Sequence, residues 1–196
     1  IILKSCTSTQ DIAKKNISQL DDLSYVVADE QTEGRGRFNR KWFSPDKKGL
    51  YISIIIHPEL SPEYYPLHSF LAGMAVSDYL QTLGLNPNLK WPNDIMIDGK
   101  KICGILCDQY ESKIIIGIGL NLSFSQNDQE KIPKPFCCLS DFLEKLPEKE
   151  IIIDHLLSKI RVLKKDSQIT EKIIPYFLKH GYKIGKKIQF RHYNKT

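Results

Sequence analysis

The sequence contains no apolar run approaching the roughly 18–20 residues that a membrane-spanning helix needs. It also shows no internal repeat and no low-complexity segment. The opening residues Ile1-Ile2-Leu3-Lys4 are too short for a secretion signal. These absences argue against membrane, repeat and secreted proteins, and they predict a cytoplasmic location with no membrane partner.

Cysteine is scarce, with five residues that form no regular framework: Cys6, Cys103, Cys107, Cys137 and Cys138. An odd count argues against a disulfide scaffold and for a reducing compartment. A structural zinc site usually needs two closely spaced ligand pairs, which this spacing does not offer. We expect buried, unreactive thiols.

The charge is modest. The net charge of +5 suits anionic partners such as nucleotides or acidic proteins, but it is too small to indicate a nucleic-acid binder. Hydrophobic residues make up 41% and charged residues 26% of the 196 positions. This composition predicts a globular chain with one sizeable domain and room for a small appendage.

Hydrophobic periodicity predicts an α/β (α+β) fold with a mixed, largely antiparallel sheet covered by helices. Strands are expected at residues 25–28, 50–56, 114–122 and 187–192, with a hairpin joining 95–97 to 101–110 through Asp98-Gly99. Helices are expected from Ser8, as a cap, and over 67–83, 140–146, 148–165 and 169–180. Pro175 should kink or interrupt the last helix.

A glycine-arginine segment, residues 33–42, follows the first predicted strand. Gly34 and Gly36 allow tight turns and close approach to a ligand, and successive backbone N–H groups can bind an anion. Arg35, Arg37 and Arg40 add guanidinium groups that suit phosphate oxygens. A basic surface loop or an RNA-binding segment stays open as an alternative, because short glycine motifs are often coincidental.

The segment Lys-Trp-Pro-Asn-Asp at 90–94 breaks the strand pattern, since Pro92 cannot donate to a ladder. Trp91 is expected in the core. Asp94 is expected to pair with an arginine or to hold magnesium.

A lysine at the start of the apolar strand at 101–110 is unusual. If Lys101 points inward, it can hold a carboxylate while Gly104 leaves room for a ring; the alternative is a solvated guard at a strand edge. Lys100 and Lys101 cannot both face the same side of the strand. Downstream, Gly117 and Gly119 indicate close approach of another group, and Asn121 suits an adenine edge or a turn at the strand end.

These segments, in this order and with Ser8-Thr9 near the start, resemble the biotin protein ligase family over about residues 5–122, and more loosely to about 190. The resemblance implies a catalytic domain of the class II aminoacyl-tRNA synthetase-like type over residues 1–181, followed at 182–196 by the start of a truncated small β-barrel. No DNA-binding helix-turn-helix precedes residue 1, so no repressor function and no DNA partner are expected. A homodimer is left open.

The implied reaction is ATP-dependent adenylation of biotin to biotinyl-5′-AMP, assisted by Mg²⁺, and transfer of biotin to one lysine of a biotin carboxyl carrier protein. Lys101, Arg35, Arg37 and Arg40 would be catalytic. The residues implied to bind biotin are Ser8, Thr9, Gln31, Gly34, Arg35, Lys101, Gly104 and Leu106. Those implied to bind ATP or the adenylate are Arg37, Arg40, Trp42 and Asn121, with Asp94 as the metal ligand.

The sequence departs from the family pattern at two positions: Gln10 stands where Asn is more frequent, and Asn39 where Gly is frequent. Asn tolerates a left-handed backbone, so the loop around Asn39 is still expected to form. Two rival functions remain at this stage, a lipoate-type acyl-protein ligase and a non-catalytic nucleic-acid-binding module.

Overall fold

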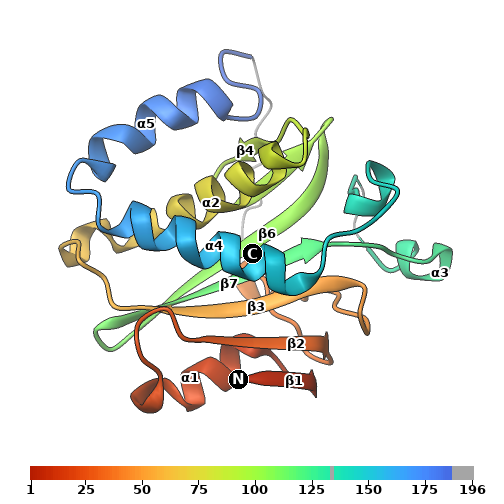
Figure 1. Ribbon diagram of the computed structural model, residues 1–196, viewed down its shortest axis with the longest axis horizontal. Helices are drawn as coiled ribbons and strands as arrows, with labels where there is room; N and C mark the ends of the chain where they lie inside the picture. The colour runs from red at the N-terminus through yellow and green to blue at the C-terminus, as the bar shows by residue number, and fades with distance from the viewer. Residues whose placement is uncertain (133–134, 187–196) are drawn as a thin grey trace, which may run out of the picture.

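The computed structural model describes residues 1–132 and 135–186, and a seven-stranded sheet forms its centre (Figure 1). The strand order is β1-β2-β3-β7-β6-β5-β4. The strands are β1 (Ile2–Cys6), β2 (Tyr25–Gln31), β3 (Gly49–Ile56), β4 (Asn88–Lys90), β5 (Asp94–Ile97), β6 (Lys100–Tyr110) and β7 (Lys113–Asn121). Among the strands of the described residues, β1 and β2 alone pair in parallel, so the expected mixed, largely antiparallel sheet is confirmed.

Helices cover both faces of the sheet. The helices are α1 (Thr9–Lys15), α2 (His68–Thr82), α3 (Gln126–Gln129), α4 (Lys149–Lys164) and α5 (Ile169–His180). Short 3₁₀ turns lie at Ile17–Gln19, Arg37–Asn39, Pro62–Leu67 and Leu139–Asp141. Helix α1 packs on β2, β3 and β7, whereas α2 packs on the sheet from the other side and carries α4 on its flank (Figure 1).

Strand β3 shows how the sequence sets the two faces. All eight of its residues are buried, including Ser53, the one polar side chain in its otherwise apolar run. Ile52, Ile54 and Ile56 belong to the larger cluster beneath α2 and α4, whereas Ile55 joins Ala13 of α1 in the smaller cluster. Because side chains alternate along a strand, α1 lies on the opposite face from α2.

Most expected strands and helices are confirmed, but the helix expected at 140–146 is wrong. One 3₁₀ turn, Leu139–Asp141, stands there, and Pro147 disfavours helical geometry for the residue before it. Helix α5 runs on through Pro175, so an interruption there is wrong, whereas the alternative of a kink stays a prediction. Ser8 precedes α1, but its side chain makes no capping hydrogen bond. The strand expected at 187–192 lies outside the described residues.

Sequence reasoning missed β1 and β4. Strand β1 lies at the edge of the sheet and is largely exposed, so it carries little apolar alternation. Strand β4 has three residues, which is too short for periodicity to register. No helix in the described part of the chain is long and apolar enough to cross a membrane.

The expectation of buried thiols is confirmed for three of the five cysteines, whereas Cys6 and Cys107 are half-buried. All five are free, and Cys103, Cys137 and Cys138 are buried. Burial raises the pKa of the Cys137 thiol to about 11 and that of Cys138 to about 12, so both stay protonated and unreactive at neutral pH.

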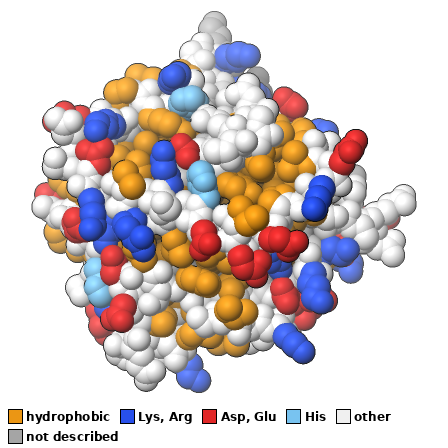
Figure 2. Space-filling model, in the orientation of Figure 1, with side chains coloured by type: hydrophobic (Ala, Val, Ile, Leu, Met, Phe, Trp, Pro, Cys, Tyr) orange, Lys and Arg blue, Asp and Glu red, His pale blue; other side chains and the backbone are white. Residues whose placement is uncertain are grey.

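Truncating the fully buried Ile54 to Ala should lower the free energy of unfolding by roughly 2–5 kcal/mol, because it removes apolar contacts and leaves a cavity. Val162→Ala is the matched control. On the face that Figure 2 shows, apolar and charged side chains intermingle. Val162 of α4 is 64% exposed, so its truncation should change stability by at most about 0.5 kcal/mol. Urea unfolding measures both, and equal losses would contradict this assignment of the core.

Candidate active site

Three glycines leave one patch of the sheet without side chains. Gly104 of β6 pairs with Gly119 of β7, and Gly117 lies two residues before Gly119 on the same face. A Cβ added at Gly104 would lie 2.8 Å from the Trp42 ring, and one at Gly117 would lie 2.8 Å from Gln10 Oε1. At Gly119 an added Cβ would collide with Trp42 Nε1. We call this patch the glycine floor; it confirms that these glycines mark close approach.

A β-bulge directs Lys101 to the same face as the glycine floor. Asp94 pairs with Gly104 and Met96 pairs with Lys101, so Ile102 is an extra residue in β6. Side chains three apart on a regular strand point to opposite faces, but the extra residue brings Lys101 and Gly104 to one face. Bulges are frequent next to active sites, where they re-aim a side chain.

Lys101 lies among an acid, a ring and the glycine floor. Its Nζ is 2.6 Å from Asp94 Oδ1 and 5.0 Å from the centre of the Trp42 ring. The two charged side chains are 30% and 20% exposed, so a ligand can reach them. Lys101 is therefore not a solvated guard lysine, and Asp94 pairs with this lysine instead of the expected arginine.

The backbone of Lys101 is fixed by a segment far away in sequence. Its N–H donates to Pro135 O (3.1 Å), and its carbonyl accepts from Cys137 N–H (2.9 Å). The buried Asn121 amide donates to both Lys101 O (3.3 Å) and Cys137 O (3.0 Å). The Nδ2 group of Asn121 therefore donates within the protein. Its Oδ1 is the atom that can accept a hydrogen bond from a ligand such as an adenine amino group.

Hydroxyl and amide groups form a network beside the glycine floor. Thr9 Oγ1 lies 2.9 Å from Ser53 Oγ, and Gln31 Oε1 accepts from the Thr9 N–H (2.8 Å). Ser53 Oγ donates to Gln10 Oε1 (2.9 Å). Ser8, Thr9 and Gln10 are all buried at the start of α1. This network can present hydrogen-bonding groups to the polar head of a small ligand.

Two members of this network were missed. Ser53 interrupts the isoleucine run of β3, and one polar residue in a fully buried strand was a usable signal. Ser44 accepts from Gln31 Nε2 at 2.8 Å, but no pattern in the sequence marks it. Leu106, implied by the resemblance, pairs with Gly117 and so lies on the same face as the glycine floor.

The segment at 33–42 forms a short hairpin, here called the lid hairpin. Arg35 and Lys41 form an antiparallel bridge, Trp42 N–H donates to Gly34 O (2.7 Å), and Gly36 N–H donates to Arg40 O (2.8 Å). Its turn places Phe38 and Asn39 in the left-handed region, at φ 56° and 58°. The expected tolerance of Asn39 for this backbone is confirmed, whereas Phe38 adopts it without glycine's freedom.

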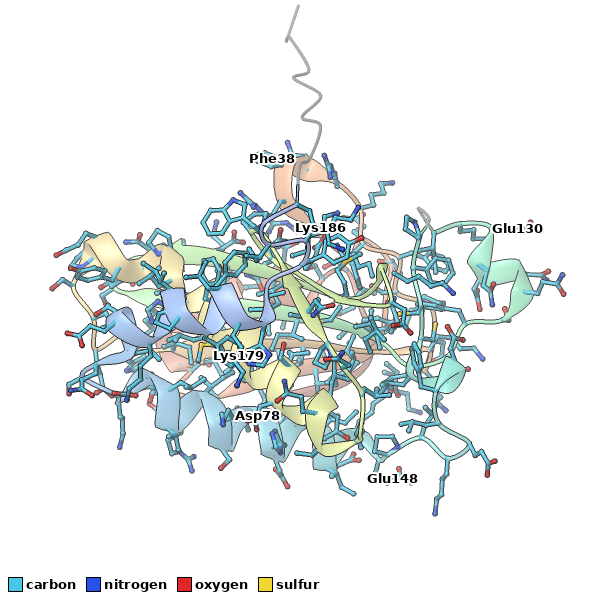
Figure 3. All side chains as sticks on the ribbon, turned by 90° about the horizontal axis from the view of Figure 1, so that it is seen from above. Phe38, Asp78, Glu130, Glu148, Lys179 and Lys186 are labelled. Carbon is cyan, nitrogen blue, oxygen red and sulfur yellow. The ribbon has the colours of Figure 1, made fainter. Side chains whose placement is uncertain are left out.

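The three arginines of the lid hairpin do not converge. Arg35 forms ion pairs with Asp11 and Asp108. Arg37 lies 4.9 Å from the Phe38 ring, and Arg40 is exposed. Figure 3 shows Phe38 at the outer end of the hairpin, and 80% of its surface is exposed. Arg37 and Arg40 are therefore free to turn toward an anion, whereas Arg35 already has acidic partners.

Asp94 is a single carboxylate. Residues 1–132 and 135–186 contain no group of three or more His, Cys, Asp or Glu side chains suited to a metal. Mg²⁺ is commonly held by one or two carboxylates together with phosphate oxygens of a bound nucleotide. Asp94 fits only that mode of binding.

Trp91 was wrongly expected in the core. It is 66% exposed and lies in the turn between β4 and β5. One face of its indole is covered by Phe70, with ring centres 5.1 Å apart, and Phe177 lies 6.3 Å away. The ring caps the edge of the larger cluster from outside.

A family model described as the biotin/lipoate A/B protein ligase family matches residues 2–125. The Bacillus subtilis bifunctional ligase/repressor BirA is 35% identical over 67% of this chain and 43% of its own length. Biotin–protein ligase 1 of Arabidopsis thaliana is 30% identical over 94% of this chain and 50% of its own. The chain thus spans about half the length of these relatives.

Solved structures agree with these matches. The Leishmania major biotin protein ligase in complex with biotin has a TM-score of 0.84 and 26% identity, over all of this chain and 85% of its own. The Aquifex aeolicus biotin protein ligase with biotin and ATP has a TM-score of 0.80 and 28% identity, over 94% of this chain and 79% of its own. The fold expected from the sequence is that of these ligases.

Gly119→Ala should expel the Trp42 ring from the glycine floor, because the new methyl group would collide with the indole. In a Trp91→Phe background, Trp42 is the single tryptophan, so its fluorescence should shift to longer wavelength. Gly36→Ala is the control, since a Cβ there meets nothing closer than 3.4 Å. An unchanged emission from Gly119→Ala, with circular dichroism showing a folded protein, would refute the stacked arrangement.

Proposed function

Because the chain belongs to the biotin/lipoate A/B protein ligase family, we propose that it is a biotin protein ligase. It adenylates biotin with ATP and then transfers the biotinyl group to a lysine of a biotin carboxyl carrier protein. The observation that carries this proposal is Lys101, directed by a bulge to the glycine floor and set beside Asp94. Several curated relatives are named as biotin ligases, among them biotin–protein ligase 1 of Arabidopsis thaliana, and these names support biotin over lipoate as the substrate.

The first step joins two anions. A biotin carboxylate oxygen attacks the α-phosphorus of ATP, the bond to the β-phosphate oxygen breaks, and pyrophosphate leaves. Lys101 offsets the repulsion between carboxylate and phosphate and holds both in reacting geometry, so catalysis needs positioning and charge and no protein nucleophile. In the second step the acceptor lysine amine attacks the acyl carbon, and AMP leaves.

Each part of the site has a role in this scheme. The hydrogen-bonded pair of Thr9 and Gln31, with the buried Ser8 beside Thr9, binds the polar rings of biotin. Gly34, Gly104 and Leu106 shape the pocket. The residues proposed to bind the adenylate are Arg37, Arg40, Trp42 and Asn121. Asp94 would hold Mg²⁺ with the nucleotide phosphates, and the ion would offset their charge.

The cytoplasm supplies ATP and keeps thiols reduced, which suits five free cysteines, so we place the protein there. Residues 1–181 would form the catalytic domain.

Lys101→Ala should slow biotin-dependent release of pyrophosphate from ATP by about two to three orders of magnitude, since one well-placed charged donor contributes about 3–4 kcal/mol to the transition state. Lys100→Ala is the matched control, because Lys100 is the adjacent lysine in the chain and its side chain is exposed. Pyrophosphate release with biotin, with lipoate and with no acid is compared. A near-normal rate in Lys101→Ala would remove this lysine from the mechanism. Pyrophosphate release with lipoate and not with biotin would show that lipoate, not biotin, is the substrate.

Residues 30–41 should become protected when the mixed anhydride forms, because a reactive intermediate must be kept from water. Chymotrypsin can cut after Phe38, which is 80% exposed. Biotin plus ATP should slow this cut at least several-fold, while ATP alone should not. Cleavage that is indifferent to both substrates would contradict the closing lid.

A further inference from the structure

Arg35 of the lid hairpin lies between carboxylates from two other elements. Its Nη1 pairs with Asp11 of α1, and its Nη2 lies 3.7 Å from Asp108 Oδ2 of β6. One side chain therefore ties the hairpin to a helix and to the sheet. Asp11 and Asp108 lie on the α1 side of the sheet, which is also the side of the glycine floor.

The charges at this point argue against direct phosphate binding by Arg35. One guanidinium and two carboxylates sum to a net charge of −1, which repels an anion. Arg37 and Arg40 make no ion pair among the described residues, so they are better placed to receive a phosphate. The role that the family resemblance gives Arg35, contact with biotin and the reacting centre, does not follow from this arrangement.

Asp108 is held in position by a buried neighbour. Gln10 Nε2 donates to Asp108 Oδ2 (3.3 Å) and to Ile115 O (3.0 Å), and Gln10 itself is only 3% exposed. Gln10 lies on Gly117 and accepts a hydrogen bond from Ser53. The carboxylate that receives Arg35 is therefore linked to the network beside the glycine floor.

Arg35 leaves the hairpin at its root, opposite Lys41, while the tip at Phe38 and Arg40 stays exposed. We propose that Asp11 and Asp108 are positioning residues that hold the lid hairpin down through Arg35. This inference rests on the proposed function, since what the hairpin covers is the adenylate. Loss of both carboxylates frees the hairpin and lets the intermediate escape or react with water.

The test uses the double variant Asp11→Asn, Asp108→Asn, which keeps side-chain size and removes charge. Exposed ion pairs are individually weak, so we expect a three- to ten-fold faster chymotrypsin cut after Phe38 and a similar increase in release of biotinyl-5′-AMP into solution. The turnover number for pyrophosphate release should change less than the KM for biotin. The single variant Asp108→Glu, which retains the charge, should show the wild-type rate of cutting and the wild-type release of biotinyl-5′-AMP.

Asp166→Asn is the matched control. Asp166 likewise forms an ion pair, with Lys172 at 2.6 Å, but it lies just before α5 and not on an element that contacts the hairpin through Arg35. Its loss should leave both the cut and the adenylate release unchanged. A comparable response in this variant would show a general effect of removing a surface carboxylate and would overturn the proposal.

Arg35→Ala separates positioning from direct contact. If the carboxylates act through Arg35, this variant equals the double variant, and combining all three changes adds nothing. A much larger loss of turnover in Arg35→Ala than in the double variant would overturn the proposal in favour of substrate contact. The chymotrypsin measurement needs no catalysis. A wild-type chain that releases no pyrophosphate would therefore contradict the proposed function, while the cleavage rates would still test whether the carboxylates hold the hairpin.

Discussion

The site depends on an ammonium group held over a part of the sheet that carries no side chains. Lys101 is placed there by one extra residue in β6, and its charge is balanced by Asp94. A lysine so placed would be costly if it were unpaired, and useless if it were locked away from ligand. Because Lys101 is partly exposed and has a single acidic partner, it is paired with Asp94 in the absence of ligand and accessible to a more highly charged ligand.

The surrounding structure keeps that arrangement in place. The segment at 135–137 and the Asn121 amide fix the Lys101 backbone, so the side chain starts from a defined point. Trp42 lies on the glycine floor because Gly104 and Gly119 allow it, and its ring faces the Lys101 ammonium. Catalysis by positioning and charge requires this kind of rigidity, since small displacements of a charged group cost rate.

The sequence predicted much of this site because glycines and a charged residue in apolar strands are locally conspicuous. From their neighbours alone, Gly117 and Gly119 were assigned to close approach and Gly104 to leaving room for a ring, whereas an inward Lys101 was one of two alternatives until the family resemblance favoured it. The bulge at Ile102 was not predictable, because it appears only when β5 and β6 are paired. The backbone bonds of Lys101 to the segment at 135–137 and the contacts of Arg35 with Asp11 and Asp108 were not predictable either, because they join positions far apart in the chain. Trp91 lies outside the core because it follows β4, the strand at the edge of the sheet.

The central claim is that Lys101 Nζ meets both reactants above the glycine floor. A crystal structure with biotin and a non-hydrolysable ATP analogue measures this directly. The account predicts Nζ within hydrogen-bonding distance of the biotin carboxylate and an α-phosphate oxygen, with the adenylate beside the Trp42 ring that covers Gly104 and Gly119. An Nζ directed into solvent, or reactants bound on the α2 face of the sheet, would contradict it.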